Sequence, residues 1–357
     1  MKNKLILITF IIIIFGIFLV SSLGNQEKIS NEVYDKLQEE DEIRVVVKLK
    51  IKEEKGFIFK TKKTDSEIEL EKQEIKQEIK QDLGQEKIKH VFDETVAVSI
   101  SEKDLKKLNK KSEIEEIIID KPIRAFLASS IPVINASVVW PVQLSGINIT
   151  GIDETICVLD TGVNFSHPDL IGKNKTCNVD CIGKTCIEDC SIGDDNGHGT
   201  HVAGIVGASG GVNGVGIEAN LIGVKVLDEN GNGVGTDLYA AIDWCVSNSS
   251  NYNISVISMS LGDCSNHSTY CNNDDSAPHI NTAVAANISV IVSAGNGPSA
   301  LCTGITNTDG PASPACVQNA TAIGAVNDAD NIFYQRGALF ELLAPGISIT
   351  STKSTGG

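Results

Sequence analysis

The first third of the chain alternates between β-rich segments and segments with helical spacing. Residues 43–51 read Ile-Arg-Val-Val-Val-Lys-Leu-Lys-Ile, and their partial alternation of apolar and polar positions favours a strand. In the charged stretch that follows, apolar residues recur at spacings of seven, four and four, which suit one face of a helix. These residues are Ile68, Ile75, Ile79 and Leu83. Gly84 is placed to end this helix, because glycine readily adopts the left-handed conformation that closes many helices.

A second helix and two further strands follow. Residues 94–100 alternate and predict a strand, and Ser101 with Asp104 resembles a capping box at the start of a helix. Residues 113–119 close the segment as another strand. The order β-α-β-α-β predicts a small α+β domain with its helices on one face of a sheet.

From residue 131 onward the pattern is different. Charged residues become fewer, and short continuous apolar runs appear at 155–159, 221–227, 254–261, 288–294 and 321–326. Helix-compatible segments lie between several of these runs, at 198–208, 235–247 and 277–287. Strands that are buried on both faces read as continuous apolar runs. The alternation therefore predicts a three-layer α/β fold, in which helices cover both faces of a doubly wound, mostly parallel sheet.

The N-terminus has the pattern of a secretory signal peptide. Lys2 and Lys4 precede an almost wholly apolar run from Leu5 to Val20, and small residues follow up to Gly24. We expect cleavage after Gly24, which makes residues 1–24 the signal peptide. The alternative is an uncleaved membrane anchor, because the stretch is just long enough to cross a bilayer. In either case the rest of the chain is exported, and we expect a secreted protein.

Cysteine usage agrees with export. None of the ten cysteines precedes residue 157, and a group of four lies within one short stretch. This group consists of Cys177, Cys181, Cys186 and Cys190. Four thiolates could bind zinc, but the spacings of three, four and three intervening residues differ from the usual pair of C-x2-C arms. We therefore expect disulfide bonds, as in other exported chains.

The net charge of −16 is divided unevenly along the chain. Residues 1–125 carry 24 Lys and Arg against 25 Asp and Glu, a net charge of −1. Residues 126–357 carry 6 against 21, a net charge of −15. This division indicates two units with different roles. Because the acidic unit should repel polyanions, we expect no nucleic-acid partner and no stable membrane association after the signal peptide is removed.

Three polar residues of the second unit are candidates for chemistry. Asp160 ends the apolar run 155–159, at the strand end where active sites of α/β sheets lie. His198 stands in Gly-His-Gly-Thr-His-Val-Ala-Gly, near the start of a predicted helix. Asn296 follows another apolar run, and an amide in such a place can donate to a developing oxyanion. Taken singly, each also has an ordinary structural explanation as a cap, a structural histidine or a turn residue.

In this order, Asp160, His198 and Asn296 resemble the first three site elements of the subtilisin family of serine proteases. The resemblance covers about residues 131–357 and includes Asp160-Thr-Gly-Val, His167-Pro-Asp-Leu, Val224-Lys-Val-Leu, Ser258-Met-Ser-Leu-Gly262, Ser293-Ala-Gly-Asn296 and Ala344-Pro-Gly346. The family's serine normally stands in a Gly-Thr-Ser-Met motif shortly after the last of these, and no Gly-Thr-Ser occurs here. We therefore expect a catalytic domain that is incomplete at its C-terminus and inactive by itself.

The resemblance implies that peptide bonds are hydrolysed through an acyl-enzyme. His198 would take the proton of the serine, Asp160 would hold the imidazole, and Asn296 would bind the oxyanion. Two segments would flank an extended polypeptide substrate and pair with it as strands. The residues expected to bind substrate are Gly233, Val234, Gly235, Ser258, Leu261, Gly262, Ala294 and Gly295. The chemistry needs no cofactor.

Calcium is common in the family as a structural ion. Asp169, in His167-Pro-Asp-Leu, matches one of the family's ligands. The expected partner loop, residues 208–215, is rich in glycine and poor in oxygen-bearing side chains. Asp169 is therefore a candidate calcium ligand without an evident set of partners.

Residues 43–125 resemble the family's inhibitory propeptide in the order of strands and helices. This resemblance predicts a chaperone-like propeptide over 25–125 and a catalytic domain over 126–357. We expect the propeptide tail to lie along Gly233 to Gly235, with a cut between about Arg124 and Ile134. The mature protein should be a monomer.

Two other functions remain open. One is an inactive, subtilase-like pseudoprotease that binds peptides without cutting them. The other is a stand-alone inhibitor or chaperone, in which residues 25–125 are the functional part.

Overall fold

The computed structural model of the protein describes residues 28–50, 65–120, 122–125, 134–297, 302, 308–327 and 329–354. The chain forms two compact units, residues 1–119 and residues 120–357, and each is considered by itself. The predicted signal peptide lies outside the described residues, as does most of the predicted cleavage region. Among the residues that are described, none belongs to a helix both long enough and apolar enough to cross a membrane.

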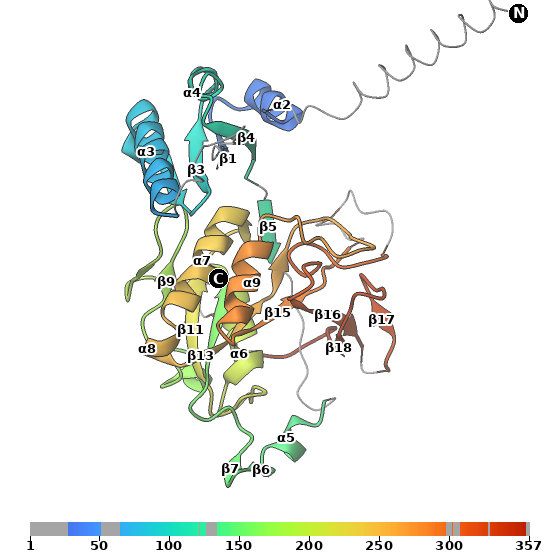
Figure 1. The fold of residues 1–357 in the computed structure, drawn as a ribbon. Coiled ribbons are helices and arrows are strands. Elements are labelled where there is room, and N and C mark those ends of the chain that lie inside the picture. The colour runs from blue at the N-terminus through green and yellow to red at the C-terminus, as the bar shows by residue number, and fades with distance from the viewer. Residues whose placement is uncertain are drawn as a thin grey trace, which may run out of the picture. The chain divides into compact units, whose positions relative to one another are not determined.

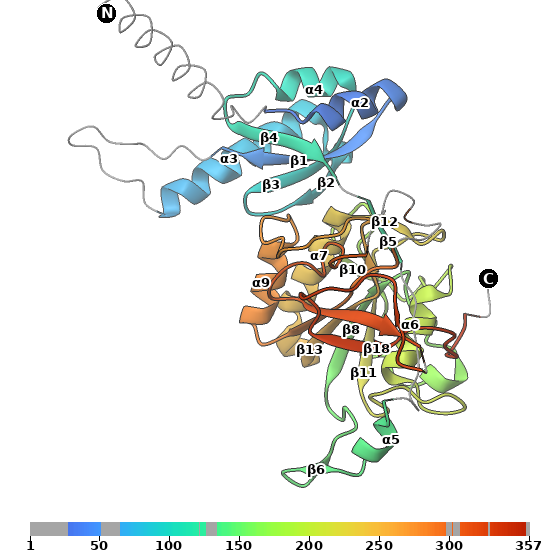
Figure 2. The same ribbon diagram turned by 90° about the vertical axis from the view of Figure 1, so that its right-hand side faces the viewer.

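The N-terminal unit contains a four-stranded antiparallel sheet with the strand order β2-β3-β1-β4 (Figures 1 and 2). Its elements are α2 (Asn31–Glu39), β1 (Ile43–Leu49), α3 (Asp65–Leu83), η1 (Gln85–Lys87), β2 (Ile88–Val91), β3 (Thr95–Ile100), α4 (Glu102–Leu108) and β4 (Ile114–Ile119). The structure confirms the predicted strands and helices β1, α3, β3, α4 and β4. The sequence pattern does not predict α2, because its nine residues bury only one side chain, or the four-residue strand β2.

One face of this sheet carries the core of the unit. Val45 of β1 lies opposite Val98 of β3, and Val47 lies opposite Ile117 of β4. Residues that are directly opposite in an antiparallel pair point to the same face. The helices contribute Val33, Ile79 and Leu108 to the same cluster of buried side chains. All three helices therefore pack on one face, as the sequence predicts.

The predicted capping box is present at the start of α4. The Ser101 side chain accepts the backbone N–H of Asp104, and the Asp104 carboxylate accepts the backbone N–H of Ser101. Asp104 is buried and also receives the ammonium groups of Lys87, at 2.6 Å, and Lys107, at 3.2 Å. Burial alone would raise the pKa of Asp104, but the bonds from Lys87, Ser101 and Lys107 outweigh it and hold the pKa well below its usual range.

The C-terminal unit is built on a nine-stranded sheet with the order β10-β9-β11-β8-β13-β15-β16-β17, and β18 also pairs with β16. Its strands are β8 (Thr155–Asp160), β9 (Val179–Asp180), β10 (Ile187–Glu188), β11 (Asn220–Lys225), β13 (Ile254–Met259), β15 (Ser289–Ser293), β16 (Thr321–Val326), β17 (Ile332–Phe333) and β18 (Leu342–Pro345). Neighbouring strands are parallel, except that β10 runs antiparallel to β9 and β17 to β16. The predicted apolar runs coincide with β8, β11, β13, β15 and β16, which confirms the mostly parallel sheet.

Helices cover both faces of this sheet. The elements outside it include α5 (Ala136–Val139), the hairpin β6 (Gln143–Leu144) and β7 (Ile147–Asn148), η2 (Pro168–Leu170), α6 (His198–Gly207), α7 (Gly235–Ser247), α8 (Ser249–Tyr252) and α9 (Ala277–Ala285). Val158 of β8 packs in one core cluster with Val202 of α6, whereas the thiol of Cys157 forms a hydrogen bond with Cys245 of α7. Successive residues of a strand point to opposite faces, so α6 and α7 lie on opposite sides. Helix α9 lies beside α7 (Figure 1).

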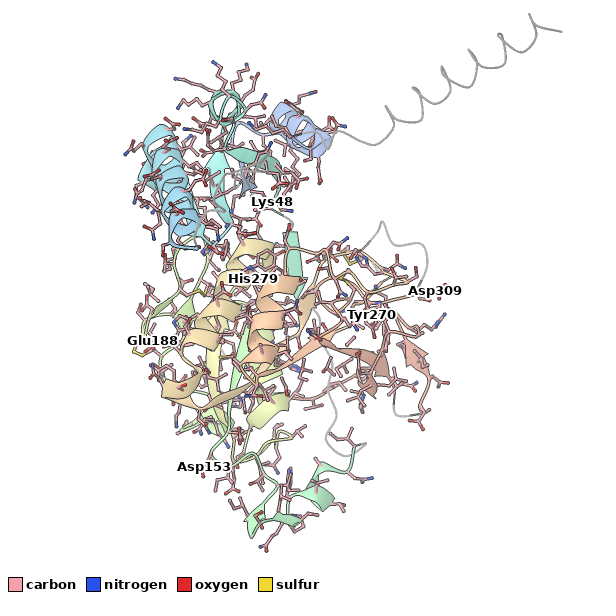
Figure 3. The ribbon with its side chains drawn as sticks, viewed as in Figure 1. Lys48, Asp153, Glu188, Tyr270, His279 and Asp309 are labelled. Carbon is pink, nitrogen blue, oxygen red and sulfur yellow. A yellow bond between two sulfur atoms is a disulfide. The ribbon has the colours of Figure 1, made fainter. Side chains whose placement is uncertain are left out.

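Four disulfide bonds are present, all in the C-terminal unit. Cys177 is bonded to Cys190, Cys181 to Cys186, Cys264 to Cys302, and Cys271 to Cys316. The group of four cysteines thus forms disulfides, as predicted, in the segment that contains Glu188 (Figure 3). The two bonds are nested, a pairing that the spacing does not predict. The two remaining cysteines, Cys157 and Cys245, are buried free thiols.

We predict that two free thiols are inaccessible to reagents in the folded chain. Burial raises the pKa of the Cys245 thiol well above its usual value, and neither thiol is exposed, so a maleimide should not label the native protein. After denaturation without reductant, mass spectrometry should find two labelled residues, Cys157 and Cys245. Reduction before labelling should raise the number to ten. A third labelled cysteine in the unreduced sample would show that one of the four disulfides is missing.

A second prediction concerns Asp104 and pH. Because its pKa is lowered in the folded state, the carboxylate contributes stability that is present above about pH 4 and is lost as the pH falls through the folded-state pKa. Asp104→Asn should lower the free energy of opening of the N-terminal unit at pH 7 by about 1–3 kcal/mol. At pH 3 the difference from the native sequence should be smaller.

Amide hydrogen exchange of β3 and α4 in the whole chain measures this opening. The matched control is Glu102→Gln, which removes an exposed carboxylate from the same helix, 2.6 Å from Lys106. This control should leave exchange unchanged. Equal protection in Asp104→Asn and the native protein at pH 7 would contradict the role of Asp104.

Candidate active site

Asp160 and His198 are brought into direct contact from positions 38 residues apart. Asp160 is the last residue of β8 and is fully buried, and His198 is the first residue of α6 and nearly so. The imidazole Nδ1 lies 2.6 Å from Oδ1 of Asp160. A carboxylate at Nδ1 favours the tautomer that carries its proton there, which leaves Nε2 as the nitrogen that can accept a proton. The pair has the geometry in which a carboxylate, here Asp160, orients a histidine, here His198, that can act as a general base.

Asn296 stands at the same edge of the sheet. It follows β15, which is separated from β8 only by β13, and Val292, Met259 and Leu159 are in register across the three strands. Two strand spacings correspond to about 10 Å. Ala294 and Gly295 precede it, and Gly295 has a φ of 116° that favours glycine. Asn296 therefore follows a turn at the carboxyl end of β15, at the edge of the sheet where β8 ends with Asp160.

The predicted peptide-binding segments form a separate three-stranded sheet. Its outer strands are β12 (Asn232–Val234) and β14 (Leu261–Gly262), and its central strand is β5 (Pro122–Ala125). Gly233 pairs with Ile123, and Gly262 pairs with Arg124, both in antiparallel register. A segment from the end of the predicted propeptide thus occupies the position that sequence reasoning assigns to an extended substrate (Figure 2).

Some predicted binding residues lie elsewhere. Ser258 lies inside β13, where it is in register with Val158, so it belongs to the central sheet and does not pair with β5. Gly235 begins α7, and a Cβ added there would lie 2.7 Å from the hydroxyl of Tyr239. The structure therefore brings Gly233, Val234, Leu261 and Gly262 together around β5 and places Ser258 and Gly235 beside them in the chain.

Asp120, just before β5, is fixed to the start of α7. Its carboxylate accepts the backbone N–H of Thr236 at 3.1 Å and also the Thr236 hydroxyl. Asp120 is buried, and a carboxylate at a helix N-terminus is stabilised by the unpaired N–H groups and the helix dipole. This contact anchors the chain immediately ahead of β5, which lies between the facing edges of β12 and β14; we call the place between these two edges the groove.

The surroundings of Asp169 do not fit a calcium ion. Its two carboxylate oxygens accept the backbone N–H groups of Gly211, at 2.8 Å, and Val212, at 2.9 Å. These bonds lower the pKa of Asp169. Calcium needs about six to eight oxygen ligands, whereas the loop offers N–H donors to this carboxylate. Calcium binding at Asp169 stays a prediction that the geometry does not support.

Sequence reasoning missed Asp194, a buried residue that contacts both parts of the candidate site. Its carboxylate accepts backbone N–H groups at the start of α6 and the hydroxyl of Thr161. An acidic residue just ahead of a helix signals a cap, so the pattern could have indicated a structural role. The contact with Thr161 joins residues 33 positions apart and has no local signal.

Comparison with known proteins agrees with this geometry. Residues 151–357 match the subtilase family. Serine protease AprX of Bacillus subtilis (strain 168) is 31% identical over 271 residues, which cover 69% of this chain and 58% of that protein. Subtilisin E of the same strain is 32% identical over 304 residues, which cover 84% of this chain and 73% of that protein. With a buried acid–histidine pair at the carboxyl edge of a mostly parallel sheet and these relatives, the chain belongs to the subtilase family of serine proteases.

Proposed function

We propose that the full-length protein is a secreted serine endopeptidase made as a zymogen. The observation that carries this proposal is the buried contact of 2.6 Å between His198 Nδ1 and Asp160 Oδ1 at the carboxyl edge of the sheet. The proposal requires a nucleophilic serine, which the 357 residues do not supply in a Gly-Thr-Ser motif.

The last described residues pack against the helix that begins with His198. The hydroxyl of Thr352 donates to the carbonyl of Thr200 at 2.6 Å, and Ser354 donates to the carbonyl of Asp194 at 3.1 Å. An added Cβ on Gly204 would lie 2.2 Å from the Thr352 hydroxyl, so the segment packs closely against α6. Sequence that continues from here would start close to the helix that begins with His198.

Each candidate residue then has one task. Nε2 of His198 takes the proton of the serine as its oxygen attacks the peptide carbonyl, and returns it to the leaving amine. Asp160 holds the proton at Nδ1 and stabilises the imidazolium that forms. Asn296 donates its amide N–H to the oxyanion of the tetrahedral intermediate. No cofactor takes part in the chemistry of the family.

The groove supports binding of extended polypeptides. The outer strands β12 and β14 offer backbone groups on both sides of a central strand, which gives affinity that is largely independent of side chains. In the zymogen, β5 takes this central place, and the buried cap between Asp120 and Thr236 holds it there. We infer that residues 25–125 are a propeptide whose tail occupies the groove as a product would.

Two other functions compete with this proposal. A pseudoprotease would share the groove but lack a serine able to react. A stand-alone inhibitor would need residues 25–125 alone to inhibit proteases. Labelling with a fluorophosphonate, which reacts with an activated serine, distinguishes the endopeptidase from a pseudoprotease. It should label the full-length endopeptidase and not a pseudoprotease.

Substitution of the candidate site should affect turnover far more than folding. In the full-length protein, Asp160→Asn and His198→Ala should each lower kcat by about 10⁴-fold or more, because both act on proton transfer. Asn296→Ala should lower kcat by about 10²- to 10³-fold with little change in KM. Hydrolysis of a chromogenic peptide measures all three.

The chain of 357 residues serves as the control without a nucleophile and should show no hydrolysis above its own His198→Ala variant. It should also remain unlabelled by a fluorophosphonate. Retention of most of kcat by Asp160→Asn or His198→Ala would refute the site assignment, and an effect of Asn296→Ala confined to KM would refute its role at the oxyanion.

Maturation provides a further prediction. N-terminal sequencing of the secreted full-length protein should find a start between about residues 125 and 135, because the strand pairing of β5 with β14 extends to Ala125. The same start should be absent when His198 is replaced by Ala, since the enzyme makes the cut itself. A mature, fully active protein that still begins near Asn25 would rule out the propeptide.

A further inference from the structure

We propose that Asp194 is a positioning residue, which holds Asp160 and His198 in the geometry needed for proton transfer. The proposal rests on the proposed function of the pair but concerns a residue that is not expected to touch substrate. Asp194 is buried, with 8% of its surface exposed, and lies four residues before His198. Its carboxylate contacts the two elements that carry the pair.

The first set of contacts is with the start of α6. Oδ1 of Asp194 accepts the backbone N–H of Gly197 at 2.8 Å and that of Asn196 at 3.1 Å. Oδ2 accepts the backbone N–H of Thr200 at 2.8 Å. Because these groups flank His198 on both sides, the carboxylate fixes the backbone from which the imidazole projects.

The second contact reaches the turn after β8. The hydroxyl of Thr161 donates to Oδ1 of Asp194 at 2.7 Å and accepts the backbone N–H of Gly199 at 2.9 Å. The backbone N–H of Thr161 donates at 2.8 Å to Oδ1 of Asp160. This is the same oxygen that His198 Nδ1 contacts at 2.6 Å. The hydrogen bonds thus form a closed ring from Asp194 through Thr161 and Asp160 to His198 and back through α6.

The ring matters because Asp160 has few other contacts. Its second oxygen, Oδ2, is buried and has no hydrogen-bond partner among the described residues. The orientation of the carboxylate therefore depends on Oδ1, and so on where Thr161 and His198 lie. A change in the position of Thr161 rotates the carboxylate away from Nδ1 with no other donor to restore it.

Lys225 holds the same turn from the other side. Its ammonium donates to the carbonyl of Thr161 at 2.8 Å, to Oδ1 of Asp195 at 2.6 Å and to the carbonyl of Leu227 at 3.0 Å. The turn is also in close contact with the loop before α6, because a Cβ on Gly162 would lie 2.4 Å from the carbonyl of Gly193. The backbone of the turn is thus fixed, and the Thr161 hydroxyl is its link to α6.

The competing explanation is that Asp194 only caps α6. A cap stabilises the helix but does not set the hydrogen bond between Asp160 and His198. The two explanations predict different results for Thr161→Val. This substitution keeps the shape of the side chain and the hydrogen bonds from backbone N–H groups to Asp194, but removes the hydroxyl. Thr161→Ser retains the hydroxyl and is the matched control.

The first measurement does not require activity. In the full-length protein, the Nδ1 proton of His198 is observed by NMR at low field, and its assignment is checked by its absence from His198→Gln. We expect Thr161→Val and Asp194→Asn to shift or broaden this resonance and Thr161→Ser to restore it. The control Asp189→Asn removes an exposed carboxylate that, among the described residues, bonds to Ser191, and should leave the resonance in place.

The second measurement is kinetic. Thr161→Val and Asp194→Asn should lower kcat roughly 10- to 100-fold, with KM little changed and the acid limb of the pH–rate profile displaced. Thr161→Ser and Asp189→Asn should keep the native values. Circular dichroism confirms that each variant is folded, and Thr161→Val keeps the test decisive if Asp194→Asn does not fold.

The outcomes separate the two proposals. An unchanged Nδ1 resonance and unchanged kcat in folded Thr161→Val would overturn the positioning role and leave Asp194 as a cap. A native full-length protein without peptidase activity would overturn the proposed function, while the NMR comparison would still decide whether Asp194 positions the pair.

Discussion

The structure depends on one costly feature, a carboxylate that is fully buried where β8 ends. A charge in such a place is stable only if hydrogen bonds replace the lost water. Asp160 obtains them from His198 and from the N–H of Thr161, so the start of α6 and the turn after β8 must stay together. A Cβ at Gly199 would lie 2.1 Å from the carbonyl of Gly162, so glycine is needed where these elements meet. The contact between Asp160 and His198 and the packing of the unit therefore depend on each other.

A second constraint is the backbone pairing that the facing edges of β12 and β14 require. Strand edges expose backbone donors and acceptors that pair readily with another strand. In this chain β5 pairs with both edges, and the hydrogen bond from Thr236 to Asp120 holds the chain just before β5. The same backbone pairing can hold an inhibitory tail and a substrate, because neither edge depends on particular side chains. Under the proposed function, inhibition and substrate recognition would therefore use one surface.

Periodicity predicts most of this fold from sequence, and particular contacts explain where it fails. Continuous apolar runs identify β8, β11, β13, β15 and β16, since each is buried on both faces. The two-residue strands β9, β10 and β17 are too short to show a period. Motifs identify Asp160 and His198, but not Asp194 or Asp120, whose bonds span 33 and 116 residues. Nor does spacing give the bond between Cys264 and Cys302, because Cys271 is nearer in sequence.

The placement of the disulfides shows how the two units differ. The N-terminal unit contains no cysteine and relies on one apolar face. In the C-terminal unit, Cys264 follows β14 and Cys302 follows Asn296, so their bond joins the groove to the candidate oxyanion turn. The nested disulfides precede Asp194 by only a few residues. Covalent links thus restrain loops of the C-terminal unit, while its sheet is held by hydrogen bonds and a buried core. Under the proposed maturation, the N-terminal unit is removed after folding and needs no such links, whereas the loops that position Asp160 and His198 would have to remain in place.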